Sequence, residues 1–359
     1  MKTIVTVVGA RPQFIKAATV SRALLEAGIS ESIIHTGQHS DANMSDVFFS
    51  ELEIPKPKHF LGISGLTHGA MTGEMLRRIE EILLQEKPDA LLVFGDTNST
   101  LAGALAAAKL HIPVAHVEAG LRSFNMKMPE EINRTLTDRV SRWLFCPTAS
   151  AVKNLKIEGY STPTFQIENV GDVMFDATLY YKKNARWPSE LPESLRKKPF
   201  VLCTLHRQES VDDTKVFTEL LSALSKIAQE SPVIWPVHPR SRKKMESLGI
   251  TPSGVHLIAP VGYLEMLALL EACTVVLTDS GGLQKEAYFF GKPCLTLREE
   301  TEWTELVELG VNVLCGLKSS AIEAAFYRNL SSPPDFREAQ PYGNGLAANA
   351  VARCLKDSI

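Results

Sequence analysis

The sequence lacks the cysteine patterns of disulfide-rich and zinc-binding proteins. Its six cysteines are scattered along 359 residues without a CxxC pair, and four of them lie in apolar runs typical of strands. We therefore expect buried free thiols and a reducing compartment, the cytoplasm. No apolar stretch approaches the roughly 18 residues that a membrane span needs. The apolar run at the N-terminus leads into Gly-Ala-Arg-Pro without a small-residue cleavage site, so it predicts a first strand and not a signal peptide.

Other missing patterns narrow the function. The chain has no basic surplus, since 38 Lys and Arg face 41 Asp and Glu for a net charge of −3, so neither nucleic acid nor a membrane surface is an expected partner. No HExxH, Cys/His cluster, GxSxG elbow or GxGxxG motif occurs. The sequence therefore predicts no metal site, no serine-hydrolase elbow and no NAD or other cofactor. An anionic ligand is compatible with this charge, because a few local cations suffice for a phosphate site.

Short apolar runs alternate with amphipathic stretches through the whole chain. Continuous apolar strands separated by helices are typical of a parallel sheet covered on both faces. A stretch at 182–198, rich in Pro, Ser and charge, divides the runs into two sets, and we interpret it as a linker. We predict two Rossmann-like, doubly wound α/β domains facing a cleft. The predicted strands are 3–9, 32–37, 90–96, 114–119, 144–147 and 165–171, then 200–206, 233–238, 255–259, 275–280, 293–297 and 312–315.

Acidic residues follow the predicted strands at their C-terminal ends, where ligands bind in open α/β sheets. Asp96 follows one strand and is equally well explained as a helix N-cap. Glu118 ends a strongly apolar run, so its burial requires a partner or a function. Glu130 and Glu131 follow Pro129 and are either acid/base groups or ordinary acidic residues of a helix start.

Basic residues and histidines occupy equivalent places. Arg11 and Lys16 follow the first strand, where two cations suit a diphosphate, with a surface position as the alternative. His206 and His238 each end a strand in the second half, and an Arg follows each within two positions, Arg240 in the case of His238. A lone histidine is usually a core residue with its hydrogen bonds made inside the protein. Two histidines at equivalent strand ends instead favour a functional site.

The segment Ser280-Gly281-Gly282 ends another strand and begins a helix. Backbone N–H groups at a helix N-terminus bind anions, and two glycines let a phosphate approach closely. Glu286 lies one turn into that helix, placed to accept hydrogen bonds from a ribose. The alternative is an ordinary Ser N-cap with tightly packed glycines.

Taken together, these motifs resemble the non-hydrolysing UDP-N-acetylglucosamine 2-epimerase family over almost the whole chain. The motifs that carry the resemblance are Gly9-Ala10-Arg11-Pro12, Gly37-Gln38-His39, Gly95-Asp96-Thr97, Val117–Arg122, Pro129–Arg134, His206-Arg207, His238-Pro239-Arg240 and Thr278–Glu286, in the family's order.

The resemblance implies a glycosyltransferase-B-like fold. Its first domain would be 1–168, the sugar and acid/base side, completed by a C-terminal helix at 346–359. The second would be 169–345, the UDP side. It also implies a UDP-sugar substrate and a homodimer.

The resemblance further implies roles for single residues. The implied catalytic residues are Asp96, Glu118, Glu130 and His206. The implied substrate and UDP contacts are Arg11, Lys16, Arg134, His238, Arg240, Met266, Ser280, Gly281, Gly282 and Glu286. For Met266, an ordinary core methionine is the alternative.

Two segments depart from the hexosamine branch of that family. The loop 123–128 reads SFNMKM where the hexosamine branch has a longer, usually aromatic loop, and 301–307 reads TEWTELV in place of Thr-Glu-Arg-Pro-Glu. Both variants resemble the sister enzymes acting on UDP-2,3-diacetamido-2,3-dideoxyglucuronate, on a route to bacterial surface polysaccharide such as O-antigen. The alternatives are UDP-N-acetylglucosamine as substrate, a glycosyltransferase on the same fold, and a non-catalytic nucleotide-sugar sensor.

The chemistry implied by the resemblance is inversion at carbon 2 of the sugar. The proton on carbon 2 has no adjacent carbonyl, so direct removal would be slow. Departure of UDP from carbon 1 makes this proton acidic, and re-addition with protonation of the opposite face inverts the centre. Such a site needs a cradle for the leaving diphosphate and acid/base groups on both faces of the sugar.

Overall fold

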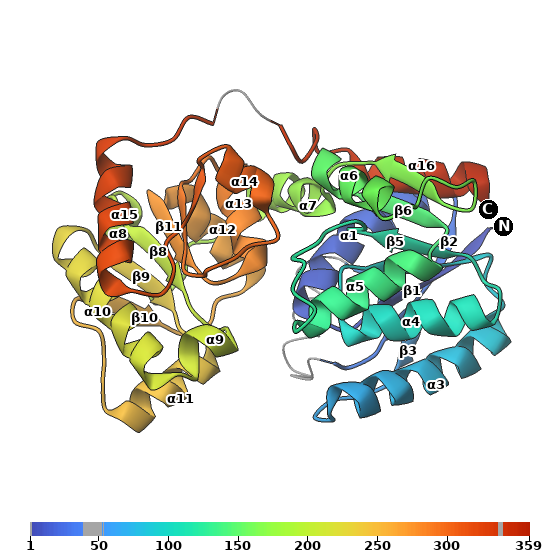
Figure 1. The fold of residues 1–359 in the computed structure, drawn as a ribbon, viewed down its shortest axis with the longest axis horizontal. Coiled ribbons are helices and arrows are strands. Elements are labelled where there is room, and N and C mark those ends of the chain that lie inside the picture. Colours follow the sequence, from blue (N-terminus) through green and yellow to red (C-terminus); the bar gives the residue numbers. More distant parts are fainter. Residues whose placement is uncertain (1, 39–51, 53, 337–339) are drawn as a thin grey trace. The chain divides into compact units, whose positions relative to one another are not determined.

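The computed structural model describes residues 2–38, 52, 54–336 and 340–359. The chain forms two compact units, Met1–Ala177 with Gln340–Ile359, and Thr178–Ala339. Each unit contains one parallel sheet with helices on both faces (Figure 1). The predicted pair of doubly wound α/β domains is therefore confirmed.

Unit 1 is built on a seven-stranded sheet in the order β3-β2-β1-β4-β5-β6-β7. Its strands are β1 Thr3–Val8, β2 Ser30–His35, β3 His59–Phe60, β4 Ala90–Phe94, β5 Val114–Val117, β6 Trp143–Cys146 and β7 Gln166–Asn169. The strands β1, β4, β5 and β6 are almost wholly buried and apolar, as a sheet covered on both faces requires.

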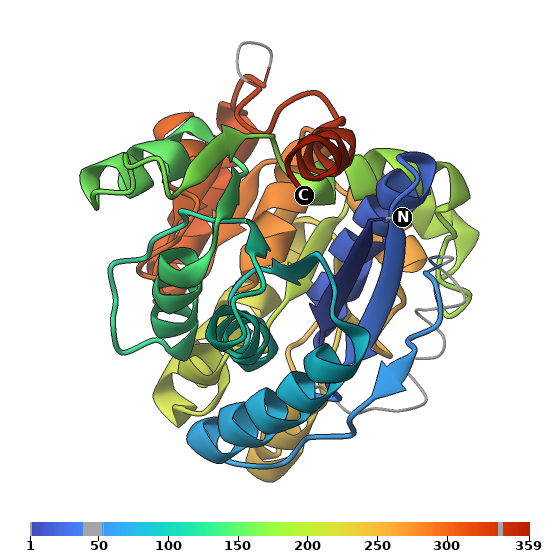
Figure 2. The ribbon, with the colours of Figure 1, turned by 90° about the vertical axis from the view of Figure 1, so that its right-hand side faces the viewer.

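The helices of unit 1 divide between the two faces of this sheet. They are α1 Arg11–Glu26, α3 His68–Glu86, α4 Asn98–Lys109, α5 Pro129–Val140, α6 Ala149–Ile157, α7 Val173–Tyr181 (whose last residues belong to unit 2) and α16 Ala347–Ser358. In Figure 2, α3, α4 and α5 lie side by side, while α1 packs against α16. The chain termini are close together, since Lys2 Nζ donates to the carbonyl of Lys356.

Unit 2 has a six-stranded parallel sheet in the order β10-β9-β8-β11-β12-β13. Its strands are β8 Val201–Thr204, β9 Val233–Pro236, β10 Val255–Ile258, β11 Val275–Thr278, β12 Cys294–Thr296 and β13 Asn312–Leu314. Its main helices are α10 Thr214–Glu230, α11 Pro239–Leu248, α12 Tyr263–Ala272, α13 Gly281–Phe289 and α15 Ser319–Ser331, with the short helices α8 Glu193–Arg196, α9 Gln208–Val211 and α14 Thr304–Glu308. Two apolar cores cover its faces, one around Phe217 and Trp235, the other around Phe200 and Leu269.

The expected linker at 182–198 is wrong. This segment is part of unit 2, because Leu191 and Leu195 are buried in its core and the ring of Trp187 contacts that of Phe200 edge to face, with centroids 5.9 Å apart. A composition rich in Pro and charge hid these apolar anchors. The chain passes between the units inside α7 instead, after Ala177.

Both unit boundaries also differ from the predicted ones. Unit 1 extends past residue 168 to Ala177, and the chain returns to unit 1 at Gln340 instead of at 346. Residues after β7 stay with unit 1 because Asp172 N donates to Tyr342 O (3.0 Å) and the Asp176 carboxylate accepts from Ala348 N (2.7 Å). These bonds tie the start of α7 to the segment before α16 and to the first turn of α16. Among the described residues, no helix combines the length and apolar character needed to cross a bilayer.

Candidate functional site

In unit 1, the order of strands reverses between β1 and β4, and the turns after these two strands lead to helices on opposite faces. Gln13 joins the two turns. Its Oε1 accepts from Gly9 N (2.8 Å) and Ala10 N (3.1 Å), and its Nε2 donates to Phe94 O (2.8 Å) and to Thr100 Oγ1 (2.9 Å). Sequence reasoning gave Gln13 no role, although a Gln three residues after a helix N-cap is a known capping signal.

Glu118 follows β5 and is buried with 6% of its surface exposed. Its carboxylate forms an ion pair with the ammonium of Lys16, which α1 carries to the same place. The backbone of Glu118 has φ +72°, a left-handed conformation that is costly for a residue with a side chain and that concentrates at functional sites. A Cβ on Gly95 would lie 3.3 Å from Glu118 Oε2 and 3.5 Å from Lys16 Nζ, so the pair lies directly against the turn after β4.

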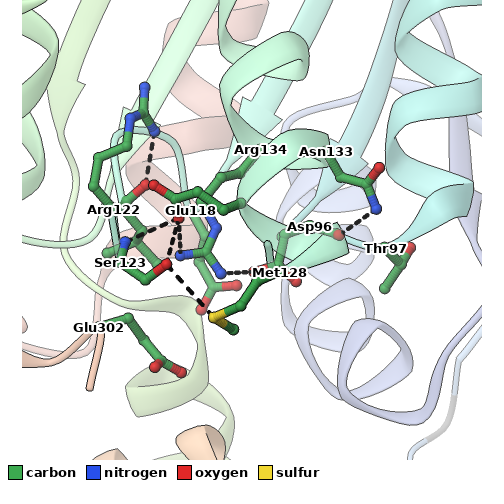
Figure 3. A network of polar contacts seen from close by, with 12 residues as sticks. Asp96, Thr97, Glu118, Arg122, Ser123, Met128, Asn133, Arg134 and Glu302 are labelled. Atoms are coloured by element: carbon green, nitrogen blue, oxygen red, sulfur yellow. Dashed lines mark hydrogen bonds and ion pairs between the residues drawn. The ribbon is translucent and has the colours of Figure 1, made fainter. Parts of the chain in front are cut away.

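Asp96 is on that turn, and α5 supplies its partners (Figure 3). The Asp96 carboxylate pairs with Arg134 Nη2, and Asn133 Nδ2 donates to the Asp96 carbonyl (2.9 Å). Thr97, the next residue, is the N-cap of α4, so the expected alternative role of Asp96 as N-cap belongs to its neighbour. Asp96 is therefore oriented by a buried cation while part of its side chain, 31%, stays exposed.

The two acids at the start of α5 differ. Glu131 is 1% exposed, and its carboxylate accepts from Ser123 N (2.9 Å), Ser123 Oγ (2.9 Å) and Phe124 N (3.0 Å). It therefore anchors the loop after β5. Glu130, the predicted catalytic acid, is exposed to solvent.

A second buried network lies beneath these turns, and sequence reasoning missed most of it. His116 is fully buried on β5 and joins Asp138 to the carbonyl of Gly95, with 2.7 Å on each side. Asp138 also accepts from Arg122 Nη1 (2.7 Å). Burial opposes ionisation of Asp138, but the hydrogen bond and charge of His116 and the charge of Arg122 outweigh it and hold the pKa of Asp138 below its usual value. The polar His116 inside the apolar run VAHV was the available signal.

In unit 2, the strand ends carry His206 and the buried Asp279. Asp279 Oδ2 accepts from the backbone N–H groups of His206 (2.9 Å) and Arg207 (2.8 Å), and Oδ1 lies 3.1 Å from His206 Nδ1. Burial works against the charge of Asp279, but His206 and these two N–H groups lower its pKa. The side chain of His206 is 40% exposed, so Asp279 orients an accessible imidazole.

His238 and Arg240 lie beside His206. The rings of His206 and His238 have centroids 5.6 Å apart, and Arg240 Nη1 is 3.5 Å from the His206 carbonyl. His238 is also the N-cap of α11, because its Nδ1 accepts from Arg240 N at 3.2 Å. The structure thus brings the three sequence-predicted residues together at one end of the sheet.

Ser280, Gly281 and Gly282 form the N-terminus of α13, with Ser280 as N-cap. The two glycines differ in their surroundings. A Cβ on Gly282 would meet nothing within 4 Å, whereas one on Gly281 would lie 2.2 Å from Glu302 Oε1. Glu302 is held by Arg298 (3.0 Å), so a side chain at position 281 would have to displace this carboxylate.

The remaining predicted residues are distributed as follows. Glu286 lies on α13 and is 6% exposed. The pKa of Tyr263 is raised mainly by the burial of its own phenol and next by the negative charge of Glu286. Met266 is partly buried against the core of unit 2, which fits the core alternative. The side chain of Arg11 and all of His39 lie outside the described part of the chain.

Within the described residues, no group of three or more His, Cys, Asp or Glu is arranged to hold a metal ion. The six cysteines are free thiols, five of them buried. Burial raises the pKa of Cys273 and of Cys294 to about 12, so these two thiols are structural groups rather than nucleophiles.

Comparison with known proteins gives matches along the full chain. A family model described as UDP-N-acetylglucosamine 2-epimerase matches residues 22–356. The UDP-2,3-diacetamido-2,3-dideoxy-D-glucuronate 2-epimerase of Pseudomonas aeruginosa is 54% identical over 354 residues, which cover 98% of this chain and 99% of that protein.

Solved structures agree in fold. The Methanocaldococcus jannaschii UDP-GlcNAc 2-epimerase, in complex with UDP-GlcNAc and UDP, matches with a TM-score of 0.89 and 42% identity over 100% of both chains. A Streptomyces glycosyltransferase complexed with thymidine diphosphate matches 100% of both chains with a TM-score of 0.56 and 17% identity, which bears on the fold alone. The expected glycosyltransferase-B-like fold is confirmed.

Proposed function

The chain belongs to the UDP-N-acetylglucosamine 2-epimerase family, and we propose that it converts UDP-2,3-diacetamido-2,3-dideoxy-D-glucuronate into its manno epimer. As an epimerase it is an isomerase. The observation that carries the choice of substrate is the 54% identity, over nearly full length, to the Pseudomonas aeruginosa enzyme that bears this substrate in its name. The segments 123–128 and 301–307, which depart from the hexosamine branch, support the same choice.

The proposed reaction is elimination followed by re-addition. A base takes the proton from carbon 2, the bond between carbon 1 and the phosphate oxygen breaks, and UDP leaves with the electron pair. The resulting glycal then takes a proton at carbon 2 from the opposite face, while the UDP oxygen bonds again to carbon 1. Atoms and charge balance without a redox step, so the scheme uses no redox cofactor.

We assign the acid/base steps to unit 1. Glu118 is ionised beside the ammonium of Lys16, as a base must be, because an opposite charge at contact distance favours the carboxylate. Asp96, oriented by Arg134 but still 31% exposed, is the second acid/base group. Glu130, exposed at the start of α5, is the third.

We assign UDP to unit 2. The N-terminus of α13 offers N–H groups and open space above Gly282 for the diphosphate, and Glu286 is the ribose partner. His206, oriented by Asp279, assists departure of the phosphate. His238 and Arg240, which lie beside His206, complete the proposed phosphate surroundings in unit 2, while the phosphate roles of Arg11 and Lys16 stay predictions from the sequence.

The test follows the sugar by proton NMR in D2O, without added metal or NAD. A manno product carrying deuterium at carbon 2 is the expected result with UDP-2,3-diacetamido-2,3-dideoxy-D-glucuronate. Exchange only with UDP-N-acetylglucosamine would move the chain to the hexosamine branch, which the family description and the Methanocaldococcus jannaschii structure favour. No exchange with either would refute the epimerase assignment.

A variant tests the base directly. Glu118→Gln keeps the size of the side chain but removes its charge, so deuterium incorporation should fall by at least about 100-fold. Turnover equal to that of the wild type would remove Glu118 from the scheme.

The proposal extends to the setting of the enzyme. We place it in the cytoplasm, on a route to bacterial surface polysaccharide such as O-antigen, because its six cysteines are free thiols and its proposed product is a sugar donor. We also propose a homodimer, which light scattering of the purified protein tests; a monomer mass near 39.5 kDa would contradict it.

A further inference from the structure

His116 faces a hydrogen-bond acceptor on each side of its ring. Nε2 lies 2.7 Å from the carbonyl oxygen of Gly95, and Nδ1 lies 2.7 Å from Asp138 Oδ1. A carbonyl oxygen only accepts, so Nε2 carries a hydrogen. An ionised carboxylate also only accepts, so Nδ1 carries one as well. The protonation of His116 therefore depends on the charge of Asp138.

Two further donors indicate that Asp138 is ionised. Besides His116, its carboxylate accepts from Gly120 N (3.1 Å) and from Arg122 Nη1 (2.7 Å). Arg122 is itself paired with Glu158 through two bonds of 2.7 Å. A carboxylate surrounded by donors and a guanidinium retains its negative charge even when buried.

The charges of this network then cancel. His116 and Arg122 supply two positive charges, while Asp138 and Glu158 supply two negative ones. His116, Asp138 and the Arg122 side chain are at most 2% exposed, so an unbalanced charge there would be costly. A neutral His116 would leave the network with a net negative charge.

The network ends at the turn that carries the proposed acid/base groups. The bond from His116 fixes the carbonyl of Gly95, the residue before Asp96. Gly95 is also the residue against which the Lys16–Glu118 pair packs.

We propose that His116 is a permanently charged imidazolium that positions the Gly95–Asp96 turn, and through it Asp96 and Glu118, for reaction. His116 is a positioning residue, since it is fully buried and acts on the turn through its bond to the Gly95 carbonyl. The catalytic part of this inference depends on the proposed epimerase function, whereas the charge state of the ring does not.

The first test reads the ring directly. Protein with ¹⁵N-labelled histidine is studied by NMR at pH 8, and the His116 signals are assigned by their absence in His116→Gln. Both ring nitrogens of His116 should carry a hydrogen, and the signals of the exposed His256 serve as the solvent-accessible reference. One unprotonated His116 nitrogen would refute the imidazolium.

The second test reads catalysis. A glutamine at 116 donates from one end only, so it cannot serve both Gly95 and Asp138. His116→Gln should lower kcat by about 10- to 100-fold while KM changes by less than about threefold, the pattern of a displaced group behind the reacting residues. His256→Gln should leave both constants unchanged. Should H116Q fail to fold, the double variant H116Q/D138N, whose two amides pair with each other, takes its place.

The outcomes separate the two claims. Two protonated nitrogens with an unchanged kcat in His116→Gln would refute the positioning role. A wild-type protein that exchanges no deuterium into either UDP-sugar would refute the proposed function and this role with it, while the ring measurement would still decide the charge state.

Discussion

The close approach of α6 to the loop after β5 can be tested at Gly120. Gly120 has φ +79°, and a Cβ there would lie 2.5 Å from the carbonyl oxygen of Ala151, 2.9 Å from its carbonyl carbon and 3.0 Å from Leu155 Cγ. These are mostly backbone atoms of α6, which cannot rotate away. Gly159, just after the same helix, has φ +84° but meets nothing within 4 Å. Alanine at either position therefore has the same backbone strain, but only Gly120→Ala has a clash.

The expected magnitudes follow from these two contributions. A left-handed non-glycine residue costs about 1–2 kcal/mol, which is the whole expected effect of Gly159→Ala. Overpacking adds about 1–3 kcal/mol, so Gly120→Ala should lose about 2–5 kcal/mol of stability. At roughly 2–4 °C per kcal/mol for a unit of this size, the clash alone should make Gly120→Ala melt about 2–12 °C below Gly159→Ala.

Scanning calorimetry of the two variants and the wild type is the assay, with deuterium exchange at carbon 2 as a second readout. Gly120→Ala should also lose activity, because Gly120 N donates to Asp138 and its carbonyl accepts from Asn154. Gly159→Ala should retain it. Equal melting temperatures for the two variants would show that α6 does not approach the loop as described.

Three further predictions concern other polar groups. Gln13→Leu leaves Gly9 N and Phe94 O without their hydrogen bonds to the Gln13 amide. The free energy of unfolding, measured by urea titration, should therefore fall by about 2–4 kcal/mol. A loss below about 1 kcal/mol would contradict the role of Gln13. Burial raises the pKa of Asp176 to about 6, from 3.8 in the unfolded chain. Between these two values the folded state binds more protons than the unfolded state. Asp176 therefore makes the free energy of unfolding fall as the pH rises from about 4 to 6. Asp176→Asn, which still accepts from Ala348 N, should therefore raise the melting temperature at pH 7.5 but not at pH 4; equal shifts at both values would be inconsistent with this pKa. Asp279→Asn should lower kcat about 10- to 100-fold, because one amide oxygen cannot accept from both backbone N–H groups and from the His206 ring. A kcat unchanged from the wild type would contradict the role of Asp279 in orienting His206.

The strands of the fold could be predicted because they are continuous, apolar and separated by helices. Helices were harder to predict where polar residues interrupt the apolar face that packs on the core. α11, PRSRKKMESL, buries only Ser241 and Met245, so its sequence gives almost no periodicity. The prediction for the segment 182–198 failed for the same reason, since three apolar anchors lie in a background of Pro and charge.

The individual residues of the candidate site could be proposed from the sequence, but the partners with which they pair could not. The apolar run before Glu118 indicated a buried acid in need of a partner, and the structure supplies Lys16, 102 residues away in sequence. Nothing local to either residue indicates such a partner. Asp138 illustrates the same limit, because nothing distinguishes it from the other two acids on α5 until the fold brings His116 and Arg122 to it.

The ion pairs around the turns after β4 and β5 are better explained by function than by stability. Replacing a buried ion pair with packed apolar side chains is often neutral or stabilising by about 1–4 kcal/mol, so the Lys16–Glu118 pair contributes little that a leucine pair would not. Glu118 in addition has a left-handed backbone, which costs stability for a residue with a side chain. Asp96 follows the same pattern, with a buried Arg134 orienting a carboxylate that remains partly exposed. Local choices that oppose stability at two adjacent strand ends are what an acid/base site requires, because carboxylates must be charged, aimed and within reach of substrate before the reaction begins.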